Sequence, residues 1–99
     1  MANIVDIEEF AKDGKEVPTH GVEYRFKVGN KLLIWSEPTI TGKQILELAQ
    51  LIPVTQYQLN QKFKHGVVEP IELTEVVELT RKGLERFTYM KLDQTEGSK

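Results

Sequence analysis

The chain has 99 residues, 39% hydrophobic and 28% charged, with a formal net charge of −2 and no cysteine. These totals are typical of one globular domain and argue against nucleic-acid binding, a disulfide framework and a thiol nucleophile of the chain's own. No apolar run reaches the roughly 18 residues of a membrane span and the N-terminus lacks a signal-peptide pattern, so we expect a cytoplasmic protein without membrane contact.

The first predicted element is a short helix within NIVDIEEFAKDGKEVP. Asp6, followed three residues later by Glu9, has the form of a capping box. Ile7 and Phe10 recur at helical spacing, and Gly14 predicts the C-terminal end. The apolar stripe is narrow, so this helix needs a surface to lie on.

A β-hairpin is predicted next. VEYRFKV (22–28) alternates between apolar and charged residues, as a half-buried strand does. Gly29 and Asn30 form a two-residue turn signal, and KLLIW (31–35) is the returning strand. The apolar face of the first strand consists of Val22, Tyr24, Phe26 and Val28.

The main helix follows SEPTITG. Thr41 and Gln44 form a second capping box, and Pro53 ends the helix. Four apolar residues share one face at a spacing of three and four: Ile45, Leu48, Ala49 and Ile52.

The last third of the chain predicts two more strands. YQLNQKF (57–63) alternates, whereas VVEPIELTEVVEL indicates a short extended piece followed by a helical or turn-like stretch. Residues 84–92 form the last strand, with Phe87 and Tyr89 as expected core residues.

This order of elements predicts an α+β fold, a β-grasp with a mixed four- or five-stranded sheet packed on one helix. Residues 1–21 are expected to form an extra N-terminal helical extension, and residues 22–92 the β-grasp domain. Residues 93–99, DQTEGSK, carry no apolar anchor and are expected to form a flexible tail.

No catalytic constellation emerges from the residue types. His20 and His65 lie beside glycines without partners at metal-ligand spacing, and Ser36 lacks a nucleophile-elbow context. Carboxylates fall at solvent-facing positions, and Trp35 is expected at the margin of the core. We therefore expect no enzyme, no metal and no cofactor, but a carrier, a modifier or an interaction module.

Several short motifs, in order, resemble the bacterial multiubiquitin domain family. EPTITGKQIL is similar to the family's entry to the main helix, with Glu37 at its acidic position, and YQLNQKF, VVEPIELTEVVELT and GLERF also fit. The resemblance covers about residues 7–90. It implies a ubiquitin-like β-grasp domain that serves as a protein modifier, joined to target amines by an isopeptide bond. The partners it implies are ubiquitin-activating-like and ubiquitin-conjugating-like enzymes and a metal-dependent deubiquitinase-like peptidase, in operons associated with anti-phage defence.

The C-terminus departs from the resemblance because ubiquitin ends in two glycines and this chain ends Gly97-Ser98-Lys99. Glycine lacks Cβ, which permits close approach in the channel of an activating enzyme. We expect a peptidase to remove Ser98 and Lys99 so that Gly97 is the conjugated residue. A frayed end without function is the alternative.

Recognition is expected to differ from that of ubiquitin. The third strand presents a polar outer face that includes Asn60 and Lys62, which are candidate partner contacts. Ile7 and Phe10 of the N-terminal helix are further candidates, and the favoured alternative is that this helix only covers the edge of the core. The alternative to a modifier is a β-grasp interaction or scaffold module that is never conjugated and self-assembles.

Overall fold

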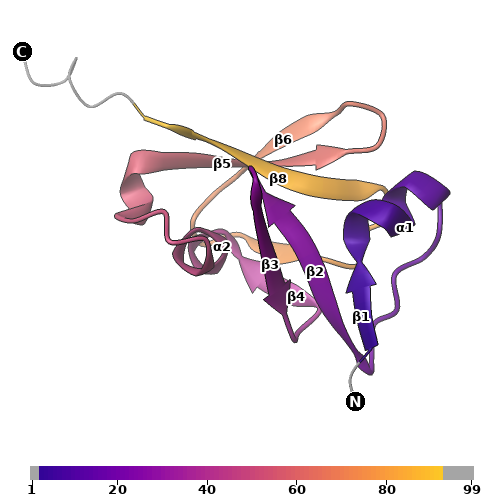
Figure 1. Cartoon of the computed structure of the whole chain (residues 1–99). Helices are drawn as coiled ribbons and strands as arrows, with labels where there is room; N and C mark the ends of the chain where they lie inside the picture. The colour runs from indigo at the N-terminus through magenta and orange to yellow at the C-terminus, as the bar shows by residue number, and fades with distance from the viewer. Residues whose placement is uncertain (1–2, 93–99) are drawn as a thin grey trace, which may run out of the picture.

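The computed structural model describes residues 3–92, which form a mixed sheet with two helices in a compact α+β arrangement (Figure 1). The predicted tail at residues 93–99 lies outside the described residues. The elements follow in the order β1 (Asn3–Asp6), α1 (Ile7–Asp13), β2 (Val22–Val28), β3 (Lys31–Trp35), β4 (Thr39–Thr41), α2 (Gly42–Leu48), the 3-10 turn η1 (Val54–Gln56), β5 (Tyr57–Phe63), β6 (Val68–Ile71), β7 (Val76–Glu78) and β8 (Leu84–Lys91).

β2 and β3 form the hairpin that the alternating pattern predicts. They pair antiparallel through a turn in which Gly29 has a φ of 62°. A Cβ at Gly29 would lie 2.7 Å from Cε2 of Tyr89, so both backbone conformation and space favour glycine there. Tyr24, Phe26 and Val28 are at most 1% exposed, which confirms the predicted core face of β2.

The last strand of the chain lies in the middle of the sheet. β8 runs parallel to β2, where Val28 is opposite Phe87, and antiparallel to β5 along its whole length. β3 adds to β2 on one side and β6 adds to β5 on the other. The order β3-β2-β8-β5-β6, with α2 between the hairpin and β5, is consistent with a β-grasp.

The N-terminal segment contributes a strand that the sequence pattern does not reveal. β1 pairs in parallel with the first half of β2 as far as Asp6 opposite Arg25. β8 also pairs with β2, but only at Val28, beyond the residues of β2 that pair with β1. The main sheet has six strands among the described residues, not four or five, and the extension predicted at residues 1–21 is partly sheet. Four residues are too few to show an alternation that identifies a strand.

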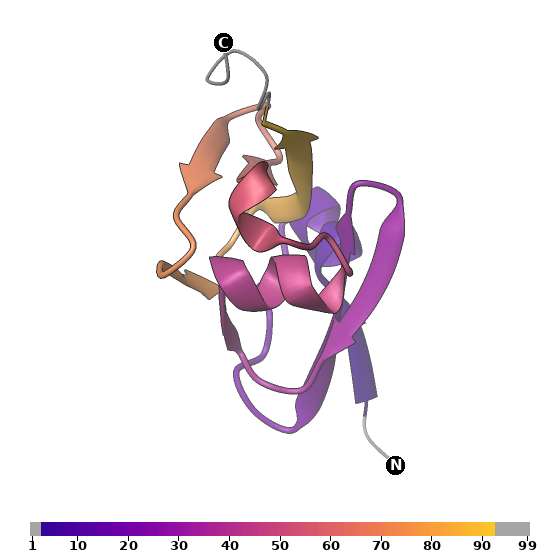
Figure 2. The same cartoon turned by 90° about the vertical axis from the view of Figure 1, so that its left-hand side faces the viewer.

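α1 begins and ends where its caps predict. Asp6 Oδ1 accepts hydrogen bonds from the backbone N–H groups of Glu8 and Glu9, at 3.0 and 3.3 Å. Gly14 closes the helix with a φ of 68°, and its N–H donates to the carbonyl of Ala11 at 3.2 Å. α1 and α2 lie on opposite sides of the sheet in both Figure 1 and Figure 2.

α2 carries the predicted capping box but is shorter than the pattern suggests. Gln44 N–H donates to Thr41 Oγ1 at 3.1 Å, and Thr41 N–H donates to Gln44 Oε1 at 2.9 Å. Gln50, with a φ of 62°, leaves the helical conformation before Ile52 is reached. Ile52 is consequently 64% exposed, and the prediction that it shares the buried face of the helix is wrong.

A second, two-stranded sheet fixes the entry to α2. β4 and β7 pair antiparallel with Ile40 opposite Val77, both buried. Extended backbone therefore occupies the end of the segment predicted to be helical or turn-like. The Gly42 N–H donates to the carbonyl of Glu75 at 3.1 Å, and a Cβ at Gly42 would overlap the carbonyl oxygen of Glu72. The glycine of TITG is thus required by packing.

Candidate functional site

The exit of the chain from the sheet is the first part of the candidate site. β8 stays paired with β5 to its end, where Lys91 is opposite Tyr57. The N–H of Leu92 then donates to the carbonyl of Gln56 at 2.7 Å. The backbone is therefore held up to Leu92. The predicted conjugation and processing residues Gly97, Ser98 and Lys99 lie outside the described residues.

The outer face of β5 is polar where the sequence predicts it. Asn60 is half-buried opposite Thr88 of β8. The ammonium of Lys62 lies 3.7 Å from Glu85 Oε1, so its charge is already paired. Both candidate contact residues thus lie on β5, although Lys62 presents less free charge than an unpaired lysine would.

Apolar side chains flank this polar strip, and the sequence reasoning missed them. Met90 of β8, opposite Gln58, is 59% exposed, and Val68 of β6, opposite Lys62, is 51% exposed. The sequence did not predict this arrangement, because Met90 and Val68 belong to other strands and only the register of the sheet places them beside β5. The outer face is therefore mixed rather than uniformly polar.

The two candidate residues of α1 have different positions. Ile7 is 1% exposed and belongs to the hydrophobic core, so it is not available as a partner contact, and that prediction is corrected. Ile7 directly follows β1, and this position turns its side chain inward. Phe10 is half-buried against the core, and the ammonium of Lys15 lies 5.6 Å from the centre of its ring. Phe10 remains partly accessible at the surface.

A buried carboxylate anchors α1 to the sheet. Glu8 is 7% exposed and accepts a hydrogen bond from Arg86 of β8. The ammonium groups of Lys12 and Lys27 lie 3.4 and 3.7 Å from its oxygens. Burial alone would raise the pKa of Glu8, but the hydrogen bond and charge of Arg86, with Lys12 and Lys27, hold it below its ordinary value.

This anchor was not evident from the sequence, which showed only the helical spacing of Glu8 and Lys12. Lys27 and Arg86 come from strands far apart in the chain and converge only in the folded sheet. The cluster is a structural ion network, because the acid is surrounded by cations and does not line either of the pockets described among residues 3–92.

No group of histidines and carboxylates among residues 3–92 has an arrangement that would hold a metal ion. His20 is exposed, and its Nδ1 lies 2.9 Å from Thr19 Oγ1 in a loop. Neither helix of the described region has the length and apolar content needed to cross a membrane.

Comparison with known proteins gives one family. A family model described as Multiubiquitin matches residues 24–91, from β2 to the end of β8. The match leaves out β1 and α1. Searches of curated proteins and of solved structures find no match.

Proposed function

Because the chain belongs to the multiubiquitin family, we propose that it is a ubiquitin-like modifier of a bacterial conjugation system. Its ubiquitin-like domain would be activated at the C-terminal carboxylate after trimming behind Gly97, and then joined to amines of target proteins. The domain itself contributes no catalytic group. Family members of this type are typically small non-catalytic modules.

The position of β8 is the observation that carries this proposal. The final strand is flanked by β2 and β5, and its hydrogen bonds hold the chain to Leu92. Five further residues lead to Gly97, and an extended chain of that length spans about 17 Å. The paired end of β8 fixes the start of this segment, and its polar residues have no apolar anchor to the domain. An enzyme could therefore bind the terminal carboxylate without clashing with the folded domain.

The reaction uses the terminal carboxylate as its only group from this chain. The carboxylate attacks ATP to give an acyl adenylate and pyrophosphate, and an enzyme nucleophile then displaces AMP. The amine of a target lysine displaces that enzyme group and forms the amide. A terminal glycine has no Cβ beside the reacting carbon, so it permits close approach at each transfer.

The proposed partners are an activating-like enzyme, a conjugating-like enzyme and a metal-dependent deubiquitinase-like peptidase. The proposed location is the cytoplasm, and the proposed biological role is anti-phage defence. Asn60 on β5 and Phe10 on α1 are proposed contact residues for these enzymes. Lys62 is proposed with them, through the aliphatic part of its side chain.

Intact mass spectrometry tests the proposal. The protein is co-expressed with a metal-dependent peptidase from a bacterial ubiquitination-like operon, and separately alone. Loss of the combined residue masses of Ser98 and Lys99, only with active peptidase, is the expected result. Gly97→Leu should block the loss, whereas Gln94→Leu, with the same bulk placed earlier in the tail, should not. An unchanged wild-type mass, with peptidase proven active on another ubiquitin-like precursor, would contradict the proposal.

A second candidate function is a scaffold module that is not conjugated and self-assembles. It is favoured by β3, which pairs only with β2 among the described strands and carries Leu32 and Ile34 at 55% and 46% exposure. Free strand edges with exposed apolar residues pair readily with other chains. Sedimentation of the wild type and of Ile34→Lys distinguishes the two. A concentration-dependent oligomer lost in Ile34→Lys supports the scaffold, and a monomer in both cases rejects it.

A further inference from the structure

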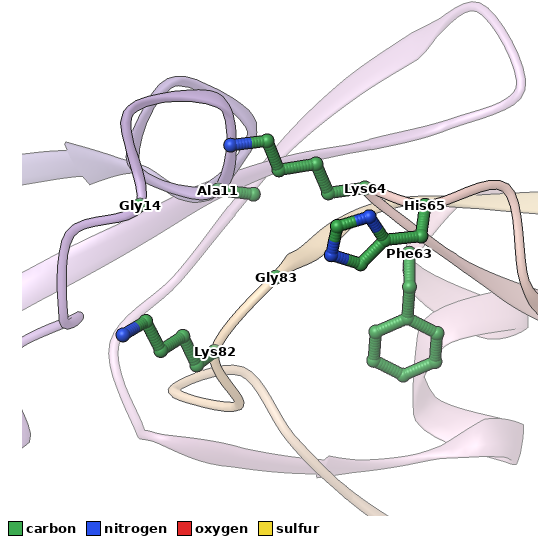
Figure 3. Close-up of a pocket in the computed structure, with 7 residues that line it drawn as sticks. All are labelled: Ala11, Gly14, Phe63, Lys64, His65, Lys82 and Gly83. Carbon is green, nitrogen blue, oxygen red and sulfur yellow. The ribbon is translucent and has the colours of Figure 1, made fainter.

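A pocket of about 280 Å³ lies where the end of α1 meets two turns (Figure 3). One turn joins β5 to β6, and the other precedes β8. Each of the three segments supplies part of the lining. The lining consists of Ala11 of α1 and its cap Gly14, of Phe63, Lys64 and His65 at the end of β5 and in the first turn, and of Lys82 and Gly83 in the second turn.

The pocket gathers positive charge that the rest of the described chain leaves unpaired. The ammonium of Lys64 donates to the carbonyl of Lys12 at 3.0 Å, which holds it across to α1. Neither Lys64 nor Lys82 forms an ion pair with a carboxylate of residues 3–92. The lining contains no acid. The neighbouring cations Lys12, Lys27 and Arg86 are instead paired with Glu8, so they would not compete with the pocket for an anionic ligand.

Apolar side chains, bare backbone and the His65 imidazole line the pocket between these charges. Ala11 is 3% exposed and forms part of the apolar wall together with Phe63. Gly14 and Gly83, with φ of 68° and 83°, line the pocket without side chains. In Figure 3 the Lys64 side chain extends toward α1, and the His65 imidazole lies between Lys64 and Gly83. The pocket therefore combines hydrogen-bond donors with a small apolar surface.

We propose that this pocket docks an acidic segment of a partner protein. A carboxylate of the segment would lie between the Lys64 and Lys82 ammonium groups, and an apolar neighbour would contact the half-buried Phe63. The complementarity is local, because the whole chain has a net charge of −2 and would otherwise repel an acidic partner. α1, which lies outside the residues matched by the family model, forms one wall.

The partner that we infer is an enzyme of the conjugation system, and only this identification rests on the proposed function. Binding of an acidic peptide does not require conjugation. A failure of peptide binding would leave trimming behind Gly97 untouched, and a failure of trimming would leave peptide binding untouched.

Amide chemical shifts of the isotope-labelled full chain test the proposal. The probes are an acetylated and amidated tetrapeptide of sequence ELDE, its uncharged counterpart QLNQ, and inorganic phosphate. We expect saturable shifts with ELDE at Gly14, Lys64, His65 and Gly83, with a Kd of about 1 mM, since one such pocket gives only a few kcal/mol. Raising the salt from about 0.05 M to about 0.5 M should weaken binding several-fold, because exposed charges are screened.

A charge-neutralised variant and a matched control complete the design. Lys64→Gln with Lys82→Gln should weaken ELDE binding at least about 10-fold, since both charge-assisted contacts are lost. Lys43→Gln with Lys91→Gln removes the same charge from exposed positions away from the pocket and should change binding less than about 2-fold.

Four results would overturn the proposal: equal binding of QLNQ, equal weakening in both double variants, shifts that lie elsewhere on the domain, or equal binding of phosphate. If phosphate produced the same shifts with equal affinity, the pocket would be a general anion site and the acidic-peptide assignment would be wrong. Superimposable spectra outside the pocket show that the variants remain folded.

Discussion

Glu8→Gln removes one charge from the junction between α1 and the sheet while keeping the shape of the side chain. The carboxylate is 7% exposed, accepts a hydrogen bond from Arg86 and lies near Lys12 and Lys27. The amide is neutral, so Arg86 and Lys27 would lose the charge that compensates their partial burial. We expect the variant to be less stable, with the loss located at the docking of α1.

The size of the loss follows from the exposure of the three partners. A pair of charges about 4 Å apart is worth about 1 kcal/mol in water and about 4 kcal/mol at an effective dielectric constant of about 20. The side chains of Arg86 and Lys27 are 33% and 44% exposed, between these limits, whereas Lys12 at 61% is largely screened. Desolvation of Glu8 offsets part of the gain. We expect Glu8→Gln to lower the free energy of unfolding by about 2 kcal/mol.

Urea unfolding followed by the fluorescence of Trp35, the only tryptophan, measures the effect. Glu9→Gln is the matched control, because Glu9 is also acidic in the first turn but is exposed and forms no ion pair among residues 3–92. It should cost less than about 0.5 kcal/mol. A loss in Glu8→Gln no larger than in Glu9→Gln would refute the reasoning.

The pH dependence supplies an independent check of the same cluster. The pKa of Glu8 in the folded chain lies below its ordinary value of 4.5, so near and below that value the unfolded chain binds the proton more readily. Its stabilisation is therefore fully present above about pH 4.5 and is lost as the pH falls through the folded pKa. The stability difference between wild type and Glu8→Gln should narrow with acidification. A constant difference down to about pH 3 would contradict the assignment.

Three further substitutions test other contacts. Gly42→Ala should lower the urea midpoint, with a loss of about 2 kcal/mol or more, because its Cβ would overlap the carbonyl of Glu72; wild-type stability would show that the 72–75 turn adjusts freely. Thr41→Ala should cost about 1 kcal/mol by removing the cap of α2, measured by thermal unfolding, and no change would mean that the cap is dispensable. Ile7→Ala should cost about 3 kcal/mol by calorimetry, as a core residue does, against less than about 1 kcal/mol for the half-exposed Ile4→Ala. Equal losses would argue against a core role for Ile7.

Much of the fold follows from local patterns. The alternation of β2 needed no tertiary information, because Tyr24, Phe26 and Val28 mark one buried face by themselves. The capping residues Asp6 and Thr41 likewise located the starts of both helices. These features depend on hydrogen bonds within a few residues, which the sequence displays directly.

The parts that the sequence did not predict depend on long-range register. β1, β4 and β7 have three or four residues each and acquire strand pairing only from neighbours distant in the chain. The apolar margin at Met90 and the ion network of Glu8 also join residues from separate elements. The alternation of β5 indicated the outward direction of Asn60, but not what would surround it.

The shared direction of β1, β2 and β8 determines where the chain enters and leaves the sheet. Since β1 and β8 both run parallel to β2, the entry of β1 at Asn3 and the exit of β8 near Leu92 lie at opposite poles of the sheet (Figure 1). Copies joined head to tail would therefore extend as a string instead of folding back on one another. A label attached ahead of Asn3 would likewise lie at the end of the sheet remote from the C-terminal exit, where it would not obstruct the proposed activating enzyme.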